Sequence, residues 1–554
     1  MSKSSSFLTV VLVALALTFA SCAGGRSSDG AQTSPPPPPN GNPQPGSSEL
    51  TLSFSGSGNG SVQSSPAGID CTNSCSASFN NGTSVSLSAT PSSDGSVFAG
   101  WSGACSGTGS CTLNINSAAS VTASFSASLQ SIKHIIFMLQ ENRSFDEYFG
   151  KLNDYRTANG LAADVDGLSS GASNPSADGS TTVPAFHMIS MCVENPSPYW
   201  PGAHTDFNLN DPTSATPTMD GFVAASAHFA VTHGFYDKAG VRTMGYYDAA
   251  DLPYYYFMAS NFATSDRWFS PVMAETPPNR MYLLAGTSAG HVYPLPTGTP
   301  GLSSKTIFQL LQENGISWKV YVTDPSPSAV AGSEMSMYAF SFQHRGNFVP
   351  ISQYFADLAS GNLPAVAMID PGFLSARDEH PVGTDGSPGG SVQVGSKYAS
   401  SLINALMASS SWKDSVFILS FDEYGGFYDH VPPQPTVSPD GILPKDLLPG
   451  DPCNNGNGAS TGGGNCDFTF TGFRVPLIVV SPFTKQHYVS HTATDYTAID
   501  KFIETRFSLP SLTRRDAAQM DMTEFFDFAD EPWKIPPTPP AQPTSGPCYI
   551  DHLP

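Results

Sequence analysis

The chain has 554 residues, enough for two or three domains, and its hydrophobic fraction of 40% is typical of a globular protein. Its formal net charge of −22 argues against nucleic acid as a partner, because binding a phosphate backbone needs clustered lysines and arginines. An acidic site would also repel an anionic substrate unless a cation is bound.

The first 21 residues have the pattern of a signal peptide. Lys3 precedes an apolar run, Phe7 to Ala20, that is too short for a comfortable membrane span. The small residues around Cys22 resemble a bacterial lipoprotein cleavage box, although Phe19 stands where that box prefers leucine. We therefore expect export, with a lipidated Cys22 anchoring the chain to the cell envelope. Plain secretion, or a periplasmic location, is the alternative.

The cysteines also indicate export. Of nine, Cys22 is set aside, and the remaining eight form an even number that suits an oxidising compartment. Three pairs are close in sequence: Cys71 with Cys75, Cys105 with Cys111, and Cys453 with Cys466. Cys192 and Cys548 are left over, and pairing them is a guess.

Residues 22–49 are rich in Pro, Ser and Gly and are predicted to form a tether without a core. Residues 50–126 then alternate polar and apolar side chains between Gly/Asn/Ser turns, which predicts a small antiparallel β module. The pattern G-x-G-x-V-x-S-x-P-A-G-I-D-C-x-x-x-C, from Gly58 to Cys75, resembles the divergent bacterial β-repeat modules of exported proteins. No catalytic constellation occurs here, which favours a spacer or surface-adhesion role.

Residues 129–554 alternate strand-length and helix-length apolar segments, which predicts an α/β domain with a mostly parallel sheet flanked by helices. The predicted strands are Ile132–Leu139, Trp318–Val322, Ala365–Ile369, Ser415–Ser420 and Val475–Val480, and the predicted helices are Lys305–Glu313, Ser401–Ser409 and Ala498–Phe507.

Two of these strands end in polar clusters. Glu141 and Asn142 follow the first strand, and Asp422 and Glu423 follow Ser415–Ser420. Because parallel strands deliver their carboxyl ends to one edge of a sheet, these oxygen donors are expected within reach of one hard cation. A salt-bridged loop is the alternative, but two such strand ends favour the metal site.

Thr276 is the candidate nucleophile, since a hydroxyl on a metal loses its proton more readily and can attack phosphorus. Pro277 favours extended geometry at Thr276, and Pro278 would stiffen the turn. Asn279 and Arg280 are expected to clamp the non-bridging phosphoryl oxygens.

Three histidines are candidates for acid–base chemistry: His204, His380 and His491. All three are expected in loops at strand ends. His491 is assigned to the loop that follows the Val475–Val480 strand.

The stretch E-N-R-S-F-D-x-Y-F-G, from Glu141 to Gly150, resembles the opening signature of the bacterial phosphoesterase family. That family contains the non-zinc-type phospholipases C and the respiratory-burst-inhibiting acid phosphatases. Further matching stretches follow in the family's order: M-G-Y-Y-D-x-x-D-L-P-Y-Y-Y from Met244, T-P-P-N-R from Thr276, E-H-P from Glu379, F-D-E-Y-G-G-F-Y-D-H-V-P-P from Phe421 and R-V-P-L-I-V-V-S-P from Arg474.

The resemblance implies an alkaline-phosphatase-like α/β fold. It also implies that a divalent metal ion, such as Ca, Mg, Mn or Zn, is held around Thr276. The implied ligands are Glu141, Asn142, Asp422, Glu423 and Thr276 itself. The family's acid phosphatases have serine at the nucleophile position, whereas Thr276 and the Asp422-Glu423 pair are similar to the phospholipase-type pattern. His204 and His380 fall where family histidines contact the phosphate or the leaving group.

We therefore expect an exported phosphoric ester hydrolase of phospholipase C type. It would cleave phosphocholine-type phospholipid esters through a phosphothreonine intermediate, with His204 or His380 protonating the leaving alcohol. An acid phosphatase acting on small monoesters is the alternative enzyme. A surface-anchored binding protein with an inert hydrolase domain is the alternative outside enzymes. The head group, the metal and the oligomeric state stay open.

Overall fold

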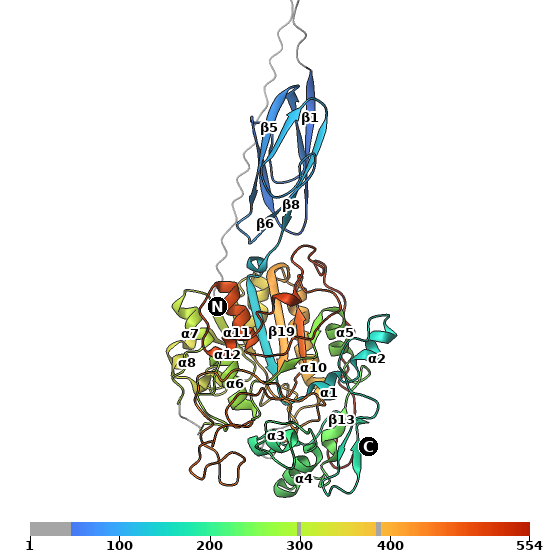
Figure 1. Ribbon diagram of the computed structural model, residues 1–554, viewed down its shortest axis with the longest axis vertical. Coiled ribbons are helices and arrows are strands. Elements are labelled where there is room, and N and C mark those ends of the chain that lie inside the picture. The colour runs from blue at the N-terminus through green and yellow to red at the C-terminus, as the bar shows by residue number, and fades with distance from the viewer. Residues whose placement is uncertain (1–45, 296–300, 384–388, 554) are drawn as a thin grey trace, which may run out of the picture. The chain divides into compact units, whose positions relative to one another are not determined.

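The computed structural model describes residues 46–295, 301–383 and 389–553 (Figure 1). The expected signal peptide, Cys22 and nearly all of the expected tether lie outside the described residues. Among the helices that are described, none combines the length and the apolar character needed to cross a membrane.

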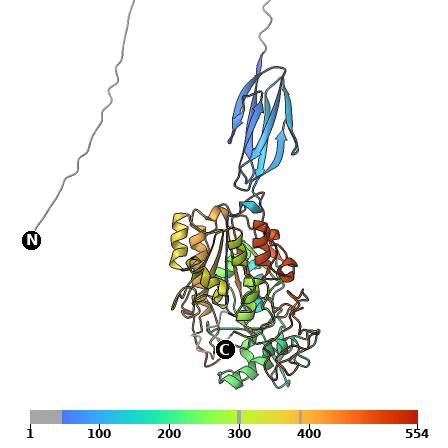
Figure 2. The ribbon, with the colours of Figure 1, turned by 90° about the vertical axis from the view of Figure 1, so that its left-hand side faces the viewer.

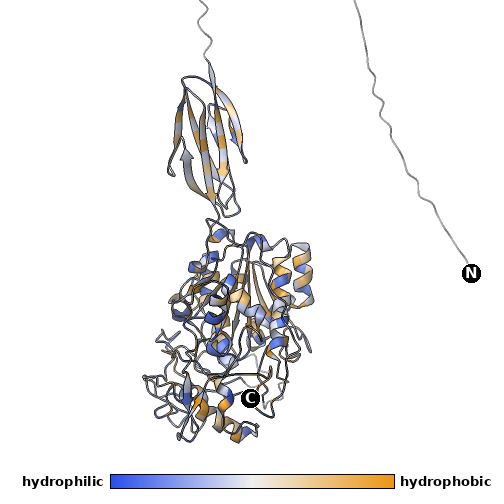
Figure 3. Ribbon diagram, turned by 90° about the vertical axis from the view of Figure 1, so that its right-hand side faces the viewer, coloured by the Kyte–Doolittle hydropathy of each residue, from blue (hydrophilic) through white to orange (hydrophobic). Residues whose placement is uncertain are grey.

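The first part of the described chain folds into two four-stranded sheets, with strand orders β4-β1-β8-β6 and β3-β2-β5-β7. Buried and exposed residues alternate along these strands, as in β8, and Figure 3 shows the matching change in hydropathy. The pairing is antiparallel except between β1 and β8, which run in the same direction. The prediction of a purely antiparallel module is wrong at that pair. The strands are β1 (Ser47–Ser55), β2 (Gly60–Ser65), β3 (Asp70–Cys71), β4 (Cys75–Asn80), β5 (Thr83–Pro91), β6 (Val97–Gly103), β7 (Cys111–Ile115) and β8 (Ala119–Ser126).

The second part is built on an eight-stranded sheet of order β17-β16-β18-β9-β19-β20-β14-β21. Strand β20 is antiparallel to both of its neighbours, and all other neighbouring pairs are parallel. The predicted mixed α/β class with a mostly parallel sheet is confirmed. The strands are β9 (His134–Gln140), β14 (Ala263–Ser265), β16 (Trp318–Val322), β17 (Phe348–Pro350), β18 (Val366–Asp370), β19 (Ser415–Phe421), β20 (Leu477–Val480) and β21 (Tyr488–Ser490).

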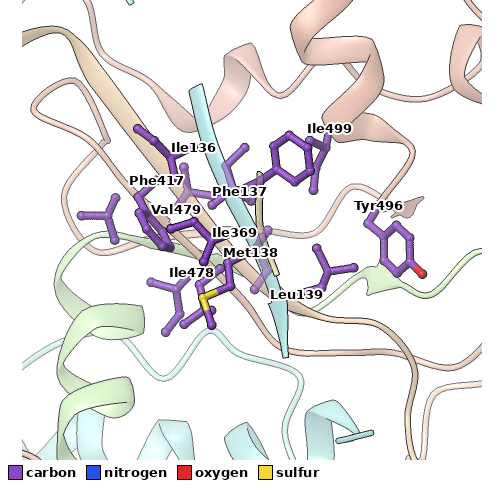
Figure 4. Packing of buried hydrophobic residues seen from close by; sticks show 14 of the residues in the cluster. Ile136, Phe137, Met138, Leu139, Ile369, Phe417, Ile478, Val479, Tyr496 and Ile499 are labelled. Carbon is purple, nitrogen blue, oxygen red and sulfur yellow. The ribbon is translucent and has the colours of Figure 1, made fainter. Parts of the chain in front are cut away.

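Helices cover both faces of this sheet (Figure 2), which explains why its central strands are apolar throughout rather than alternating. On β9 every residue from Ile135 to Leu139 is buried, and Figure 4 shows the side chains of Ile136 to Leu139 among residues of β18, β19, β20 and α11. The helices are α1 (Phe145–Phe149), α2 (Leu152–Ala158), α3 (Trp200–Phe207), α4 (Phe222–His233), α5 (Pro253–Asn261), α6 (Thr276–Ala285), α7 (Ile307–Glu313), α8 (Ala339–Gln343), α9 (Ser352–Ser360), α10 (Val392–Met407), α11 (Ala498–Phe507) and α12 (Arg514–Ala517).

Four disulfides join the eight cysteines beyond Cys22. They connect Cys71 with Cys75, Cys105 with Cys111, Cys453 with Cys466, and Cys192 with Cys548. The three pairs expected from sequence proximity are present, and so is the pair of leftover cysteines. Such a set is typical of an extracellular protein.

Candidate active site

The carboxyl ends of β9 and β19 meet at one edge of the sheet. These strands are parallel neighbours, with Gln140 paired to Phe421, so Glu141 and Asp422 emerge side by side. The backbone N–H of Asn142 donates to Asp422 Oδ1 at 2.9 Å, and that of Asp422 donates to the Gln140 carbonyl at 3.0 Å. The two polar clusters that the sequence placed at strand ends therefore form one structural unit.

A tight turn brings these two segments together. Asn142 has a φ of 60°, a left-handed conformation that asparagine tolerates better than most residues. Gly425, opposite, also has a positive φ, and a Cβ there would lie 2.3 Å from the Asn142 carbonyl oxygen. Only glycine allows so close an approach.

Thr276 joins this unit from another part of the chain. Its hydroxyl oxygen lies 3.1 Å from Glu141 Oε2 and 3.1 Å from Asn142 Oδ1, so it can donate to either. Thr276 is the first residue of α6, and the extended conformation falls on Glu275 instead. The predicted extended Thr276 is wrong because prolines are tolerated in the first turn of a helix, where backbone N–H groups have no intrahelical acceptor.

A cavity of about 400 Å³ opens in front of the Thr276 hydroxyl. Glu141, Asn142, Thr276 and His380 all line it, so it unites four of the residues singled out in the sequence. Half of the 12 other lining residues are acidic or aromatic: Glu275, Glu334, Asp378, Tyr199, Phe229 and Phe373.

Arg280 lies behind this wall rather than in it. It is 2% exposed, and its guanidinium contacts Glu141 at 2.6 Å, Asp422 at 3.3 Å and Glu334 at 3.0 Å. Its charge is thus engaged by three carboxylates, and the structure does not place it as the expected clamp on a phosphoryl group. It holds the carboxylates of the site together.

Asn279 is also withdrawn from the cavity. Its Oδ1 accepts a hydrogen bond from the Val272 N–H at 3.1 Å, and its Nδ2 donates to the Ala274 carbonyl at 2.6 Å. The side chain is fully buried. It fixes the chain that leads into α6, and so positions Thr276 instead of contacting a phosphate.

The three predicted histidines are separated in the structure. His380 lines the cavity, with Nε2 3.1 Å from Asn142 Nδ2. His491 follows β21, not the Val475–Val480 segment as expected, and its 57% exposed side chain pairs with Asp266 at 2.9 Å. It lies outside the cavity wall.

His204 belongs to a helix, α3, and not to a strand-end loop as predicted. Its ring is fully buried against Trp200, and Nδ1 lies 2.9 Å from the Trp200 carbonyl. Burial lowers the pKa of His204 to about 4, against backbone hydrogen bonds that raise it. It is therefore neutral at pH 7 and is not in the cavity wall.

Carboxylates dominate the electrostatics of the site. Burial, together with the charge of Asp422, raises the pKa of Glu141 well above its usual value, although Arg280 opposes this. Burial likewise raises the pKa of Glu334 to about 8 and that of Asp378 to about 7. Neither Glu334 nor Asp378 was predicted. Asp378 precedes the conspicuous His380 in sequence, whereas nothing in the pattern around Glu334 indicated a role.

The donor set fits a divalent cation. Glu423 is fully buried. Its Oε2 accepts from the Gly425 N–H at 2.6 Å, whereas its Oε1 has no hydrogen-bond partner. A buried carboxylate oxygen without a partner is costly, and a cation would remove that cost. Carboxylate, amide and hydroxyl oxygens are the ligands that hard cations prefer.

The spacing of possible metal ligands, taken alone, would indicate metal sites at other residues. Among the described residues, the acidic and histidine groups whose atoms lie within 4.8 Å of one another are Asp146–Asp429–His430 and His187–Asp248–Asp251. The carboxylates of Glu141, Asp422 and Glu423 are not so close, since Arg280 lies between the first two.

Most of this chain is similar in sequence to known proteins. The phosphoesterase family model matches residues 132–510, and the divergent InlB B-repeat domain matches residues 50–129. Phospholipase C B of Mycobacterium tuberculosis is 30% identical over 451 residues, covering 73% of this chain and 79% of that protein. Non-specific phospholipase C1 of Arabidopsis thaliana is 27% identical over 423 residues, covering 72% of each chain.

Among solved structures, a protein in the alkaline phosphatase superfamily from Vibrio parahaemolyticus is 12% identical. It covers 67% of this chain and 78% of its own, with a TM-score of 0.30. That score is too low to establish a common arrangement.

Proposed function

This chain belongs to the phosphoesterase family, and from that premise we propose that it is an exported, metal-dependent phospholipase C acting through a phosphothreonine intermediate. The observation that carries the proposal is the Thr276 hydroxyl, held between Glu141 and Asn142 on the wall of an acidic cavity. Lipidation at Cys22, outside the described residues, would keep the enzyme on the cell envelope.

The metal site of the proposal consists of Glu141, Asn142, Thr276, Asp422 and Glu423. Bound there, Ca²⁺, Mg²⁺, Mn²⁺ or Zn²⁺ would offset the negative charge of the phosphate and make the threonine hydroxyl easier to deprotonate. Without a cation, an anionic phosphate would face a wall that carries Glu275, Glu334 and Asp378.

Thr276 Oγ1 attacks phosphorus as the bond to the leaving alcohol breaks, its proton passes to Glu141 Oε2, and water later cleaves the phosphothreonine ester. His380 is the histidine in the cavity wall and is proposed to protonate the departing oxygen. Arg280 keeps Glu141 and Asp422 in place, and Asn279 holds the start of α6.

The proposal extends to a cationic head group of the phosphocholine type. The cavity combines carboxylates with the aromatic side chains of Tyr199, Phe229 and Phe373. A quaternary ammonium group is recognised by this combination, since aromatic faces attract cations and carboxylates complement the charge. A phosphate monoester without a cationic group would gain nothing from these residues.

The test is an assay of the purified mature protein on phosphatidylcholine and on p-nitrophenyl phosphate, each with and without a chelator. Chelator-sensitive release of phosphocholine supports the proposal. Release of inorganic phosphate alone points to the acid phosphatase alternative. No hydrolysis of either ester by metal-loaded protein would favour the binding protein with an inert hydrolase domain.

A further inference from the structure

A second cavity, of about 700 Å³, lies directly beside the acidic one. The two cavities share two wall residues, Tyr199 and Phe229. Their rings contact each other with centroids 5.5 Å apart, so the pair forms the partition between the cavities. In Figure 1 the two helices that contribute most to the second cavity, α3 and α4, lie beyond the carboxyl ends of the strands.

The second cavity is much less acidic than the first, with one carboxylate in its wall against four. Leucine, alanine and proline make up eight of its 19 lining residues, and the polar ones include Thr205, Thr232, His228 and His233. Its one carboxylate, Asp451, accepts hydrogen bonds from the Tyr293 hydroxyl at 2.9 Å and the Leu448 N–H at 2.6 Å. That group is therefore engaged within the wall, and the basic side chains of the wall are two histidines, His228 and His233, with no lysine or arginine.

The wall of this cavity is held in place by its surroundings. Trp200, at the start of α3, donates from Nε1 to the Pro452 carbonyl at 3.1 Å. The next residue, Cys453, forms a disulfide with Cys466. The segment 448–452 is thus tied to α3 on one side and to a closed loop on the other. The volume of the second cavity falls within the range of preformed ligand pockets.

We infer that the second cavity binds the apolar diacylglycerol part of a phospholipid while the acidic cavity holds its phosphate and head group; this inference rests on the proposed function. A phospholipid has a polar and an apolar part joined at the scissile ester, and the molecule offers two adjoining cavities of matching character. Leu448, which lines the second cavity, is 54% exposed and provides an apolar edge at its mouth. Each methylene moved from water into such a wall favours binding.

The experiment fills the second cavity. Ala224 is half-buried on α4 and lines it, so Ala224→Phe reduces its volume. Val231 lies on the same helix, is 62% exposed and does not line the cavity, so Val231→Phe is the matched control. Thr232→Trp, at an exposed lining position, is the second variant in case the first fails to fold.

Two substrates separate the two cavities, because dihexanoylphosphatidylcholine has acyl chains and p-nitrophenylphosphorylcholine has none. We expect Ala224→Phe and Thr232→Trp to lower kcat/KM for the first by about tenfold or more. Activity on the second should stay within about twofold of the parent. Val231→Phe should behave as the parent on both. Equal effects on both substrates, or none, would overturn the inference.

Binding of dihexanoylglycerol, measured by calorimetry, distinguishes failure of the inference from failure of the proposed function. If the parent hydrolyses neither ester but binds this probe, and Ala224→Phe or Thr232→Trp weakens binding at least about tenfold, the proposed function fails and the cavity assignment stands. If the parent does not bind the probe, or the lining variants bind it as the parent does, the assignment is wrong.

Discussion

Two buried clusters of charged side chains arise from the same two segments, which follow β9 and β19, and their charges are balanced in different ways. The segment after β9 contributes Glu141 to one and, from the first turn of α1, Asp146 to the other, and the loop after β19 contributes Asp422 and Asp429. In the first cluster a single buried arginine, Arg280, faces three carboxylates.

The second cluster is matched. Arg474, fully buried, contacts Asp146 at 3.0 Å and Asp429 at 2.8 Å, and His430 Nδ1 lies 2.7 Å from Asp146. Asp166 Oδ1 also lies 3.1 Å from His430 Nε2, and its Oδ2 pairs with Arg267 at 2.6 Å, so three carboxylates meet two guanidinium groups and one imidazole. Burial raises the pKa of Asp429 to about 6 against the charge of Arg474, still below neutrality, whereas Glu334 in the first cluster reaches about 8.

The contrast distinguishes a charged cluster that stabilises the fold from one that belongs to the candidate active site. Asp146, Asp429 and His430 have the spacing of a metal site, yet hydrogen bonds and ion pairs already engage their atoms. The first cluster lacks that spacing, but Glu423 beside it keeps a buried carboxylate oxygen without a hydrogen-bond partner. Unbalanced charge beside a cavity is therefore our reason for proposing the cation and phosphate site at the first cluster.

The largest expected effect is on activity, in the unbalanced cluster. Thr276→Ala removes the proposed nucleophile, and we expect kcat/KM on phosphatidylcholine to fall by about 10⁴-fold or more. The free energy of unfolding should change by less than about 1 kcal/mol, because the hydroxyl is only half-buried. Thr276→Ser, which keeps a hydroxyl, is the control and should retain part of the activity. Near-parental turnover by folded, metal-loaded Thr276→Ala would remove Thr276 from the mechanism.

The matched cluster should instead respond in stability. Arg474→Gln leaves the Asp146 and Asp429 carboxylates buried without their cation, which is expected to cost about 3–5 kcal/mol of unfolding free energy. Urea unfolding with the disulfides intact measures it. Lys305→Gln is the control: this lysine is 48% exposed and pairs with the exposed Glu313, so a loss below about 1 kcal/mol is expected. Equal losses in both variants would mean that the second cluster is not a stabilising unit.

Two isosteric substitutions, one in each cluster, should change the free energy of unfolding in opposite directions. Burial raises the pKa of Glu423 well above its usual value, so its carboxylate costs stability when ionised. Glu423→Gln is expected to stabilise chelator-treated protein by about 1 kcal/mol while weakening metal binding. Asp146→Asn places an amide where the carboxylate accepts from Arg474 and His430, and should destabilise by about 2 kcal/mol. Urea unfolding measures both changes. If both variants were stabilised, or both destabilised, the two clusters would not differ in the way that we describe.

Much of the fold could be predicted because its central strands and helices carry strong local patterns. The segments predicted as Trp318–Val322 and Ala498–Phe507 coincide with β16 and α11. The strand-end position of Glu141 and Asp422 also followed from pattern alone. The direction of β20 did not, because a four-residue apolar strand buried on both faces looks the same in either direction.

The site was harder to predict where distant residues decide the role of a side chain. Arg280 looked like a phosphate clamp until its partners were known, and Glu334 comes from a segment without a recognisable pattern. His204 followed a Pro-Gly pair that suggests a loop, whereas the proline lies in the first turn of α3. Burial against Trp200, which sets its pKa, is a tertiary property.

The smallest expected effect is a pH dependence of stability that belongs to the matched cluster. Burial alone would lower the pKa of His430, but the hydrogen bond and charge of Asp146, with Asp429, raise it from 6.5 to about 9. A folded-state pKa above the unfolded value means that protonated His430 contributes its full stability below pH 6.5, and that this contribution is lost as pH rises through 9.

The difference in unfolding free energy between the parent and His430→Gln should therefore shrink from pH 6 to pH 9. His491→Gln is the control, since its side chain is 57% exposed, and its difference from the parent should change less. A His430→Gln difference that stays constant over this range would show that the pKa of His430 is the same in the folded and unfolded states. At neutral pH most of the imidazole would then be uncharged, and the second cluster would have three carboxylates for two guanidinium groups, closer in balance to the first.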